Sequence, residues 1–351
     1  MSNLEDVAKA AGVSRSTVSR VINNEGYVSA ATRARVLEAV ERLHYIPNHA
    51  ARTLVTQRSD VIGVVMPSAN VFFGDNSYFP MLLQGIAEAA NPRDISMILW
   101  LGQANEDPEH FSQRITRNRL CDGLIIASIG YDDPLIRRLV ESVPYFVMVE
   151  RPIHYQDRIS YVTCDNVKGG QMATEHLIRN GRRRVAHITG RLDLADGQDR
   201  MVGYRTALER AGYPYDPQLI VEGQFSYESG YYAMKTLLHQ KFDAVFIPSD
   251  TAARGAMRAI EEAGLRIPDD IAIVGFDDLE DAARTNPPLT TIRQPVQQKG
   301  AAALTLLLDL IDGRVENPYQ VILPLQLVIR QSCGANITQQ IQTQGGAANN
   351  R

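Results

Sequence analysis

Cysteines are few in this chain of 351 residues, and long apolar runs are missing. Cys121, Cys164 and Cys333 lie far apart, without CxxC or Cys/His spacing, so we expect buried thiols in a reducing compartment rather than disulfides or a zinc site. No stretch of 18 apolar residues occurs, which argues against a membrane span. The start, MSNLEDVAKA, lacks the basic and apolar regions of a secretory signal, so we expect a cytoplasmic protein.

The motifs of common enzyme classes are also missing. No GxSxG, HExxH or P-loop sequence occurs, and the seven histidines are scattered without metal-ligand spacing. The adjacent carboxylates Asp277 and Asp278 could serve acid–base chemistry, but neighbouring residues at a strand end point in different directions. We therefore expect no catalytic residues, no metal and no cofactor.

The charge that is present is unevenly distributed. Residues 1–58 hold eight basic and five acidic side chains, a net charge of +3, although the whole chain carries −4. A small basic segment on a larger acidic body suggests that the segment meets a polyanion such as nucleic acid. An asymmetry of this size also arises by chance, so charge alone does not decide the function.

The first 45 residues are predicted to form three short helices. Ser2 and Glu5 can form a capping box at the start of the first helix. Gly12 can end that helix, and Ser14 can cap the next one.

The second helix is expected over about 15–23 and the third over about 31–44. The third helix is expected to bury Val36, Leu37, Val40 and Leu43. Two helices joined by a short turn containing glycine match the helix-turn-helix motif.

From residue 61, apolar β-branched runs alternate with helical stretches. The predicted strands are Val61–Met66, Ile95–Leu101, Gly123–Ile129, Phe146–Val149, Val185–Thr189, Ala244–Pro248 and Ile271–Phe276. The predicted helices lie near 79–91, 107–119, 133–142, 167–180, 199–211, 228–239 and 252–263. This alternation predicts a parallel, doubly wound α/β architecture, and its length favours two lobes over one sheet.

Four segments, in the same order, carry a resemblance to one family. They are Val13–Asn23, the stretch from Tyr45 to Leu54 that contains Pro47, the segment Val274–Asp278, and Pro287–Ile292. Together they resemble the recognition helix, hinge and effector-domain motifs of the LacI/GalR family of bacterial transcription regulators. The resemblance runs from about residue 4 to 333.

The resemblance implies a helix-turn-helix head, a hinge helix and a core like type I periplasmic sugar-binding proteins. The implied divisions are 1–46 for the head, 47–59 for the hinge and 60–335 for the effector-binding core. Within the core, the implied lobes are 60–162 with 292–322, and 163–291 with 323–335. The glutamine-rich tail, 336–351, is expected to be disordered.

The second helix is the predicted reader of operator DNA. Side chains at the start of a recognition helix reach base edges in the major groove, and arginine can bond guanine with two hydrogen bonds. The predicted base contacts are Arg15, Ser16 and Arg20. The predicted backbone contacts are Ser14, Thr17, Ser19 and Asn23. Without the resemblance, a solvated helix face would be the simpler interpretation.

The hinge is expected, from the resemblance, to contact the minor groove. Two hinge helices of a homodimer would pair closely at Ala51 and insert Leu54 between base pairs, at the cost of unstacking. A role for Leu54 as an apolar plug on the core is the alternative. A two-fold symmetric dimer implies a pseudo-palindromic operator and binding that weakens with salt.

An effector site is expected between the lobes, because open α/β sheets bind ligands beyond the carboxyl ends of their strands. By resemblance, the candidate contacts are Tyr78, Phe79, Asp165, Arg200, Phe225, Asp250 and Asp277. Glu150 and Arg151 are weaker candidates. The aromatic residues could instead be core residues, and Asp250 could be a cap or a partner in a salt bridge. Carboxylates, arginine and aromatic rings suit a carbohydrate, and a purine-like ligand is the alternative.

The sequence thus predicts a nucleoid-associated transcription regulator, for which a repressor is the preferred interpretation. The regulator is expected to bind double-stranded operator DNA and a small-molecule effector, and to have no membrane contact. An enzyme and a transport-type sugar-binding protein are the rival classes. The helix-turn-helix motif and the absence of a signal peptide argue against the second of these.

Overall fold

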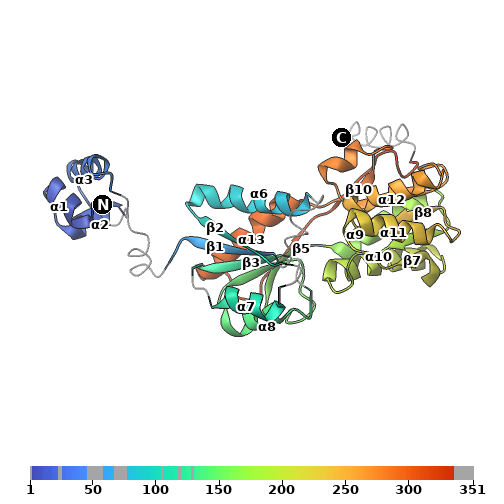
Figure 1. Ribbon diagram of the computed structural model, residues 1–351, viewed down its shortest axis with the longest axis horizontal. Coiled ribbons are helices and arrows are strands. Elements are labelled where there is room, and N and C mark those ends of the chain that lie inside the picture. Colours follow the sequence, from blue (N-terminus) through green and yellow to red (C-terminus); the bar gives the residue numbers. More distant parts are fainter. Residues whose placement is uncertain are drawn as a thin grey trace, which may run out of the picture. The chain divides into compact units, whose positions relative to one another are not determined.

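The structure is a computed structural model that describes residues 2–22, 26–45, 58–66, 77–103, 106–117, 120–127 and 130–335. The chain divides into two compact units, Met1–Ser59 and Asp60–Arg351 (Figure 1). We describe each unit by itself.

The first unit, the head, contains three helices, which are α1 (Leu4–Ala11), α2 (Arg15–Ile22) and α3 (Ala30–Arg42). Their inward faces form one small core, with Val7, Val18 and Val36 among its fully buried members. The predicted burial of Leu37 is wrong, because this side chain is 51% exposed. It lies one step around the helix from Val36, and Ala39 occupies the next buried position instead.

The cap of α1 also differs from the prediction. The Asn3 side chain accepts hydrogen bonds from the backbone N–H groups of Glu5 and Asp6, and the Asp6 carboxylate accepts one from the Asn3 N–H. The Ser2 hydroxyl instead donates to the carbonyl of Leu43 at 2.6 Å. The capping box is therefore shifted by one residue, and Ser2 ties the chain start to the end of α3.

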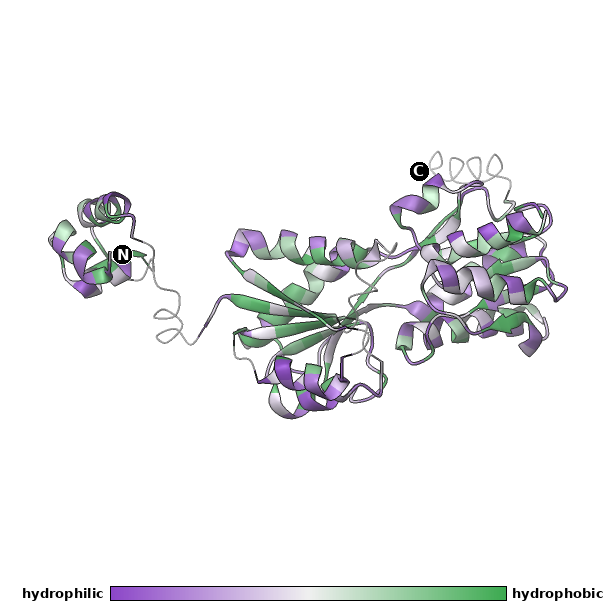
Figure 2. Cartoon of the chain, in the orientation of Figure 1, coloured by the Kyte–Doolittle hydropathy of each residue, from purple (hydrophilic) through white to green (hydrophobic). Residues whose placement is uncertain are grey.

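The second unit contains two six-stranded sheets, and we call the parts built on them lobe one and lobe two. The sheet of lobe one is entirely parallel, in the order β11-β5-β4-β3-β1-β2. Its strands are β1 (Val61–Met66), β2 (Ser96–Leu101), β3 (Gly123–Ala127), β4 (Phe146–Val149), β5 (Ser160–Cys164) and β11 (Gln320–Leu323). The strands are strongly hydrophobic, as Figure 2 shows.

Helices cover both faces of this sheet. Two of them, α6 (Tyr78–Ala90) and α13 (Val296–Ile311), pack on one face through Leu82, Ile86 and the leucines of α13. The other face packs against α7 (Pro108–Thr116) and α8 (Pro134–Ser142). The short helix η1 (Asn91–Arg93) follows α6.

Lobe two has the sheet order β12-β10-β9-β8-β6-β7, in which only β12 is antiparallel to its neighbour β10 among the pairs described. Its strands are β6 (Val185–Ile188), β7 (Ile220–Val221), β8 (Ala244–Phe246), β9 (Ala272–Asp277), β10 (Thr290–Arg293) and β12 (Gln326–Val328). Its helices are α9 (Asn166–Arg179), α10 (Ala195–Ala211), α11 (Tyr227–Leu237), α12 (Asp250–Glu262), η2 (Pro217–Leu219) and η3 (Glu280–Arg284). The pair α9 and α10 covers one face, and the pair α11 and α12 covers the other.

The chain passes between the two sheets three times. It leaves lobe one after β5 to enter α9, returns after β10 to enter α13, and leaves again from β11 to β12. The strand ends at β4, β5, β9 and β10 therefore approach the same region of the second unit. None of the helices in the described ranges is long and apolar enough to cross a membrane.

A buried histidine in lobe two gives a testable dependence of stability on pH. The His187 ring stacks on Phe246 and Tyr204, with ring centroids 4.7 Å and 4.9 Å apart. Its Nδ1 donates to the carbonyl of Phe246 at 2.9 Å, which leaves Nε2 buried without a hydrogen-bond partner. Burial, together with the charge of Arg200, lowers the pKa of His187 to about 4.

Because the unfolded histidine takes up a proton below about pH 6.5 and the folded one does not until about pH 4, His187 destabilises the fold as the pH falls across this interval. Asp196 and Asp277 act in the opposite direction, since burial raises the pKa of each to about 6. We therefore expect the free energy of unfolding of His187→Phe to rise relative to that of the parent as the pH falls from 6.5 to 4. The expected gain is about 1 kcal/mol or more for each pH unit. Urea titrations of both proteins at pH 7.5 and pH 4.5 measure this difference. Equal stability differences at the two pH values would contradict the assignment.

Candidate functional site

The exposed face of α2 is the first candidate site. Val18 and Val21 are buried, whereas Arg15, Ser16 and Arg20 point away from the core of the head. The Arg15 side chain is 66% exposed, and its Nε lies 3.4 Å from the Glu5 carboxylate. An ion pair this exposed is weak, so Arg15 can turn to another partner at little cost.

The start of α2 is held by a group of hydroxyls. Ser14 Oγ accepts from the Thr17 N–H at 3.2 Å, which confirms the predicted cap. The same oxygen is 2.8 Å from Ser16 Oγ and 2.9 Å from Thr17 Oγ1. Ser19 is half-buried, and Asn23 lies outside the described residues.

The hinge residues Ala51 and Leu54 also lie outside the described residues. Their predicted roles at the minor groove therefore stay predictions.

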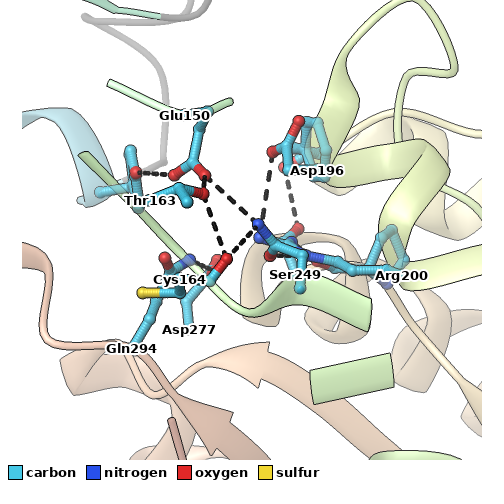
Figure 3. A network of polar contacts seen from close by, with 12 residues as sticks. Glu150, Thr163, Cys164, Asp196, Arg200, Ser249, Asp277 and Gln294 are labelled. Carbon is cyan, nitrogen blue, oxygen red and sulfur yellow. Dashed lines mark hydrogen bonds and ion pairs between the residues drawn. The ribbon is translucent and has the colours of Figure 1, made fainter. Parts of the chain in front are cut away.

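The second candidate site is a group of buried polar side chains where the chain crosses between the lobes. We call it the interlobe cluster, and its members are Tyr78, Glu150, Asp196, Arg200, Asp277, Gln294 and Lys299. Figure 3 labels Glu150, Asp196, Arg200, Asp277 and Gln294 together with neighbouring residues. Lobe one supplies Tyr78 from α6 and Lys299 from α13, and lobe two supplies Arg200 from α10.

Lys299 is the central residue of the cluster on the lobe-one side, and its side chain is fully buried. Its Nζ forms an ion pair with Glu150 Oε1 and donates to Gln294 Oε1 at 2.6 Å and to Tyr78 Oη at 3.3 Å. An ammonium has three N–H groups, so all of them are used inside the protein. Burial alone would lower the pKa of Lys299, but the negative charge of Glu150 outweighs it and raises this pKa above its ordinary value.

Glu150 connects the hydrogen bonds of Lys299 in lobe one to residues of lobe two. Its Oε2 accepts from Thr163 Oγ1 at 2.7 Å and from Asn166 Nδ2 at 3.3 Å, and Asn166 Oδ1 accepts from Arg200 Nε at 3.0 Å. Burial would raise the pKa of Glu150, but Lys299 and the Thr163 hydroxyl hold it below its ordinary value. The carboxylate is therefore ionised and fully hydrogen-bonded.

Arg200 is the centre of the lobe-two side, and it is 2% exposed. Its guanidinium lies 3.7 Å from the centroid of the Phe276 ring and 5.6 Å from that of Phe225. NH1 donates to the carbonyl of Pro248 at 2.5 Å, and NH2 lies 3.9 Å from Asp196. A cation stacked on aromatic rings and bonded along its edge is rigidly oriented.

Two carboxylates complete the cluster. Burial raises the pKa values of Asp196 and Asp277 to about 6, although the charge of Arg200 acts against this shift. Asp277 Oδ1 accepts from Gln294 Nε2 at 2.5 Å, which links β9 to the crossover after β10. Figure 3 shows both carboxylates near the end of the Arg200 side chain.

The structure thus places Tyr78, Arg200 and Asp277 of the predicted effector contacts in the interlobe cluster, with the Phe225 ring beside Arg200. It does not bring the other three into the same cluster. The Phe79 ring packs in the core of lobe one, and the exposed Asp165 caps α9 by accepting from the Lys168 N–H at 2.9 Å.

Asp250 is the third of these residues, and its carboxylate is used within lobe two. One oxygen accepts from Thr291 Oγ1 at 2.6 Å and the other from the Leu279 N–H at 2.8 Å. Both oxygens hold α12 against the sheet. Asp250, Phe79 and Asp165 thus have structural roles, and their predicted contacts with an effector stay predictions.

Sequence analysis missed Lys299, Gln294 and Asp196, and it ranked Glu150 as a weak candidate. One signal for Lys299 was present: it is the only basic residue of α13, a helix that otherwise consists of apolar, small and polar residues with one aspartate. A single cation at the start of such a helix, soon after a strand, is unusual and indicates a buried or functional role.

An ion pair and a backbone hydrogen bond also connect the lobes beside the cluster. Arg151 of lobe one forms a two-pronged ion pair with Asp199 of α10, at 2.6 Å and 3.2 Å. The Tyr131 N–H donates to the carbonyl of Asp193 at 3.2 Å, and the Asp193 carboxylate pairs with Arg191.

Two family models match the chain. Residues 3–48 match the model described as bacterial regulatory proteins, lacI family, and residues 174–333 match the model of the periplasmic binding protein-like domain. These two matches fall on the head and on the second unit.

Named relatives match along nearly the whole chain. The HTH-type transcriptional regulator CelR of Thermobifida fusca is 39% identical over 332 residues, 94% of this chain and 97% of that protein. The HTH-type transcriptional repressor PurR of Yersinia pestis (strain Pestoides F) is 34% identical over 336 residues, 95% of this chain and 97% of that protein. Both are named as regulators rather than as enzymes.

Two solved structures of regulators are similar to this chain over nearly its whole length. A complex of the regulator CelR with cellobiose is 36% identical with a TM-score of 0.75, covering 95% of this chain and 100% of that one. The lac repressor dimer bound to operator and the anti-inducer ONPF is 30% identical with a TM-score of 0.82, covering 95% and 99%. The predicted resemblance and fold class are confirmed: the chain belongs to the LacI family of bacterial regulatory proteins and is a DNA-binding transcriptional regulator.

Proposed function

We propose that the chain is a cytoplasmic repressor that binds a pseudo-palindromic operator as a homodimer, under the control of a carbohydrate bound at the interlobe cluster. One observation carries the proposal: buried, oriented polar groups from both lobes converge on Arg200 at the point where the chain crosses between the sheets. A ligand that contacts groups of both lobes can change the angle between them.

An edge of lobe one supports the dimer. Strand β2 ends the first sheet, and its Met97 and Leu99 side chains are each 38% exposed. An apolar edge strand favours association with another chain. The lac repressor structure is named as a dimer, and a two-fold dimer would present two α2 helices to two half-sites of DNA.

The chemistry of the interlobe cluster supports a carbohydrate. Sugar hydroxyls both donate and accept, and they suit the carboxylates of Asp196 and Asp277 beside the guanidinium of Arg200. The ring of Phe225, close to Arg200, offers a face for an apolar sugar surface. The cellobiose complex of the related CelR favours the same class. The relation to PurR keeps a purine-like metabolite as the alternative, which a binding assay decides.

Ligand binding at the interlobe cluster is coupled to DNA binding at α2 if the ligand has different affinities for different arrangements of the lobes. A ligand that binds one lobe arrangement better than another shifts the population toward it. In this proposal the arrangement of the lobes sets the spacing of the two hinge segments, including Ala51 and Leu54, and through them the affinity for the minor groove.

Selection of DNA by the full-length protein tests the proposal. We expect duplexes enriched from a random library to contain two inverted half-sites, because two α2 helices related by two-fold symmetry read the same sequence. Binding should weaken steeply between 50 and 200 mM salt, as expected when several phosphates are neutralised, by about 10³-fold or more. Enrichment of a single half-site without symmetry would contradict the dimeric repressor.

A further inference from the structure

The interlobe cluster has an excess of negative charge. Five of its groups act on one another electrostatically: the carboxylates of Glu150, Asp196 and Asp277, and the cations of Lys299 and Arg200. Three carboxylates against two cations leave one negative charge in this set when all are ionised.

The two cations of the cluster are already balanced by carboxylates, since Lys299 pairs with Glu150 and the charge of Arg200 acts on both Asp196 and Asp277. All three N–H groups of Lys299 are used by Glu150, Gln294 and Tyr78. Arg200 donates to Asn166 and to the Pro248 carbonyl and faces Asp196. A phosphate or carboxylate at Lys299 would have to displace an internal acceptor. One at the remaining N–H groups of Arg200 would lie beside the carboxylates of Asp196 and Asp277 (Figure 3).

Other cations near the lobe junction have carboxylate partners as well. Arg151 is paired with Asp199 and Arg191 with Asp193. Arg293 and Arg330 share the carboxylate of Asp278, each at 2.6 Å. In the ranges that the structure describes, the members of the cluster thus offer hydrogen-bond groups without a spare positive charge.

Asp277 is a carboxylate without a cation of its own. Glu150 is paired with Lys299, whereas Asp277 shares the charge of Arg200 with Asp196 and has the neutral amide of Gln294 as its hydrogen-bond partner. A ligand hydroxyl can accept from Arg200 and donate to Asp277, but an anionic oxygen can only accept and is repelled by this carboxylate.

We propose that the effector site accepts uncharged saccharides and rejects phosphorylated or carboxylated ones, with Asp277 as the residue that discriminates. This inference rests on the proposed carbohydrate effector and names its charge class. Like charges brought together in a site with little water weaken binding strongly, so we expect an anionic sugar to bind at least about 100-fold less tightly than its uncharged counterpart.

Isothermal titration of the full-length protein with matched sugar pairs at pH 7.5 tests the proposal. The pairs are cellobiitol with cellobionate, glucose with glucose 6-phosphate, and galactose with galacturonate, and cellobiose is added as a ring-closed reference. Cellobiitol and cellobionate share an open chain and differ in the carboxylate. We expect a neutral member to bind and its anionic counterpart to bind at least about 100-fold more weakly.

The variant Asp277→Asn identifies the discriminating residue. It removes the charge at nearly constant shape, so we expect the ratio between neutral and anionic affinities to fall by about tenfold or more, even if both affinities fall. Asp269→Asn, the same change at an exposed turn of lobe two where Asp269 pairs with Arg266, should leave the ratio unchanged. Thermal unfolding of each variant verifies that it is folded.

The outcomes separate this inference from the proposed function. An anionic sugar that binds as tightly as its neutral counterpart, or an unchanged ratio in Asp277→Asn, overturns the charge selection and leaves the carbohydrate effector intact. Failure of every neutral sugar, with binding of a purine base such as hypoxanthine or of no probe, counts against the carbohydrate effector itself.

Discussion

Replacing Lys299 with methionine should lower the free energy of unfolding by about 3–5 kcal/mol, the usual cost of removing one partner of a buried ion pair. Lys299 has no solvent exposure, and its loss leaves the Glu150 carboxylate buried without its cation. Methionine fills a similar volume, so the loss reflects charge rather than a cavity. Urea unfolding of the parent and the variant at pH 7.5 measures the difference.

The double variant Lys299→Met with Glu150→Gln separates the pair from its surroundings. A glutamine oxygen can still accept from Thr163 and Asn166, and its nitrogen can donate to Tyr78, so neither residue of the pair leaves an uncompensated charge. We expect the double variant to recover all but about 1–2 kcal/mol of the loss. Lys235→Met, on the exposed side of α11, is the matched control and should change stability by less than about 0.5 kcal/mol. A double variant as unstable as the sum of the two single variants would show that the pair does not act as a unit.

Replacing Arg15 with alanine should weaken binding to the selected operator by about 5- to 150-fold, the equivalent of 1–3 kcal/mol for a two-pronged contact to a base. Arg15 is largely exposed on α2 and contributes nothing to the core of the head, so the fold should be preserved. Arg15→Lys should not restore the affinity, because an ammonium cannot make the planar two-pronged contact. Fluorescence anisotropy with the operator and with a scrambled duplex measures both effects.

The ratio between the two duplexes makes this test specific. Arg35→Ala removes the same charge from the exposed surface of α3 and should affect operator and scrambled DNA by similar, smaller factors. If Arg15→Ala weakened both duplexes equally, Arg15 would contact phosphate rather than bases.

Much of the fold could be predicted from local patterns, and the exceptions have physical causes. β1 and β4 have the predicted bounds, since both are continuous apolar runs buried on both faces. β5 was missed because its sequence, Ser160–Cys164, mixes serine, threonine and tyrosine with a single valine, yet all five residues are buried between neighbouring strands. The short strands β7 and β12 carry too few residues for any periodicity, and tertiary pairing alone makes them strands.

The candidate site could be predicted only where a residue belongs to a recognisable motif. Arg200 and Asp277 were predicted by resemblance, whereas Lys299 was not, because no helix was predicted over Val296–Ile311 and a charged residue in a helix is normally solvent-exposed. Its partner Glu150 lies 149 positions earlier in the chain, and only the packing of α13 on the first sheet brings them together. The neighbours Tyr78 and Phe79 show the same limit, since the turn of one residue along α6 sends one ring to the interlobe cluster and the other into the core.

The central claim is that one molecule couples a ligand at the interlobe cluster to DNA at α2, and reciprocal titration tests it most directly. The affinity for the operator is measured with and without saturating effector, and the affinity for the effector is measured with and without saturating operator. Coupling through one protein requires the two factors to be equal, and we expect each to lie between about 5 and 150. Tight binding of both ligands with a factor of one in either direction would contradict the account.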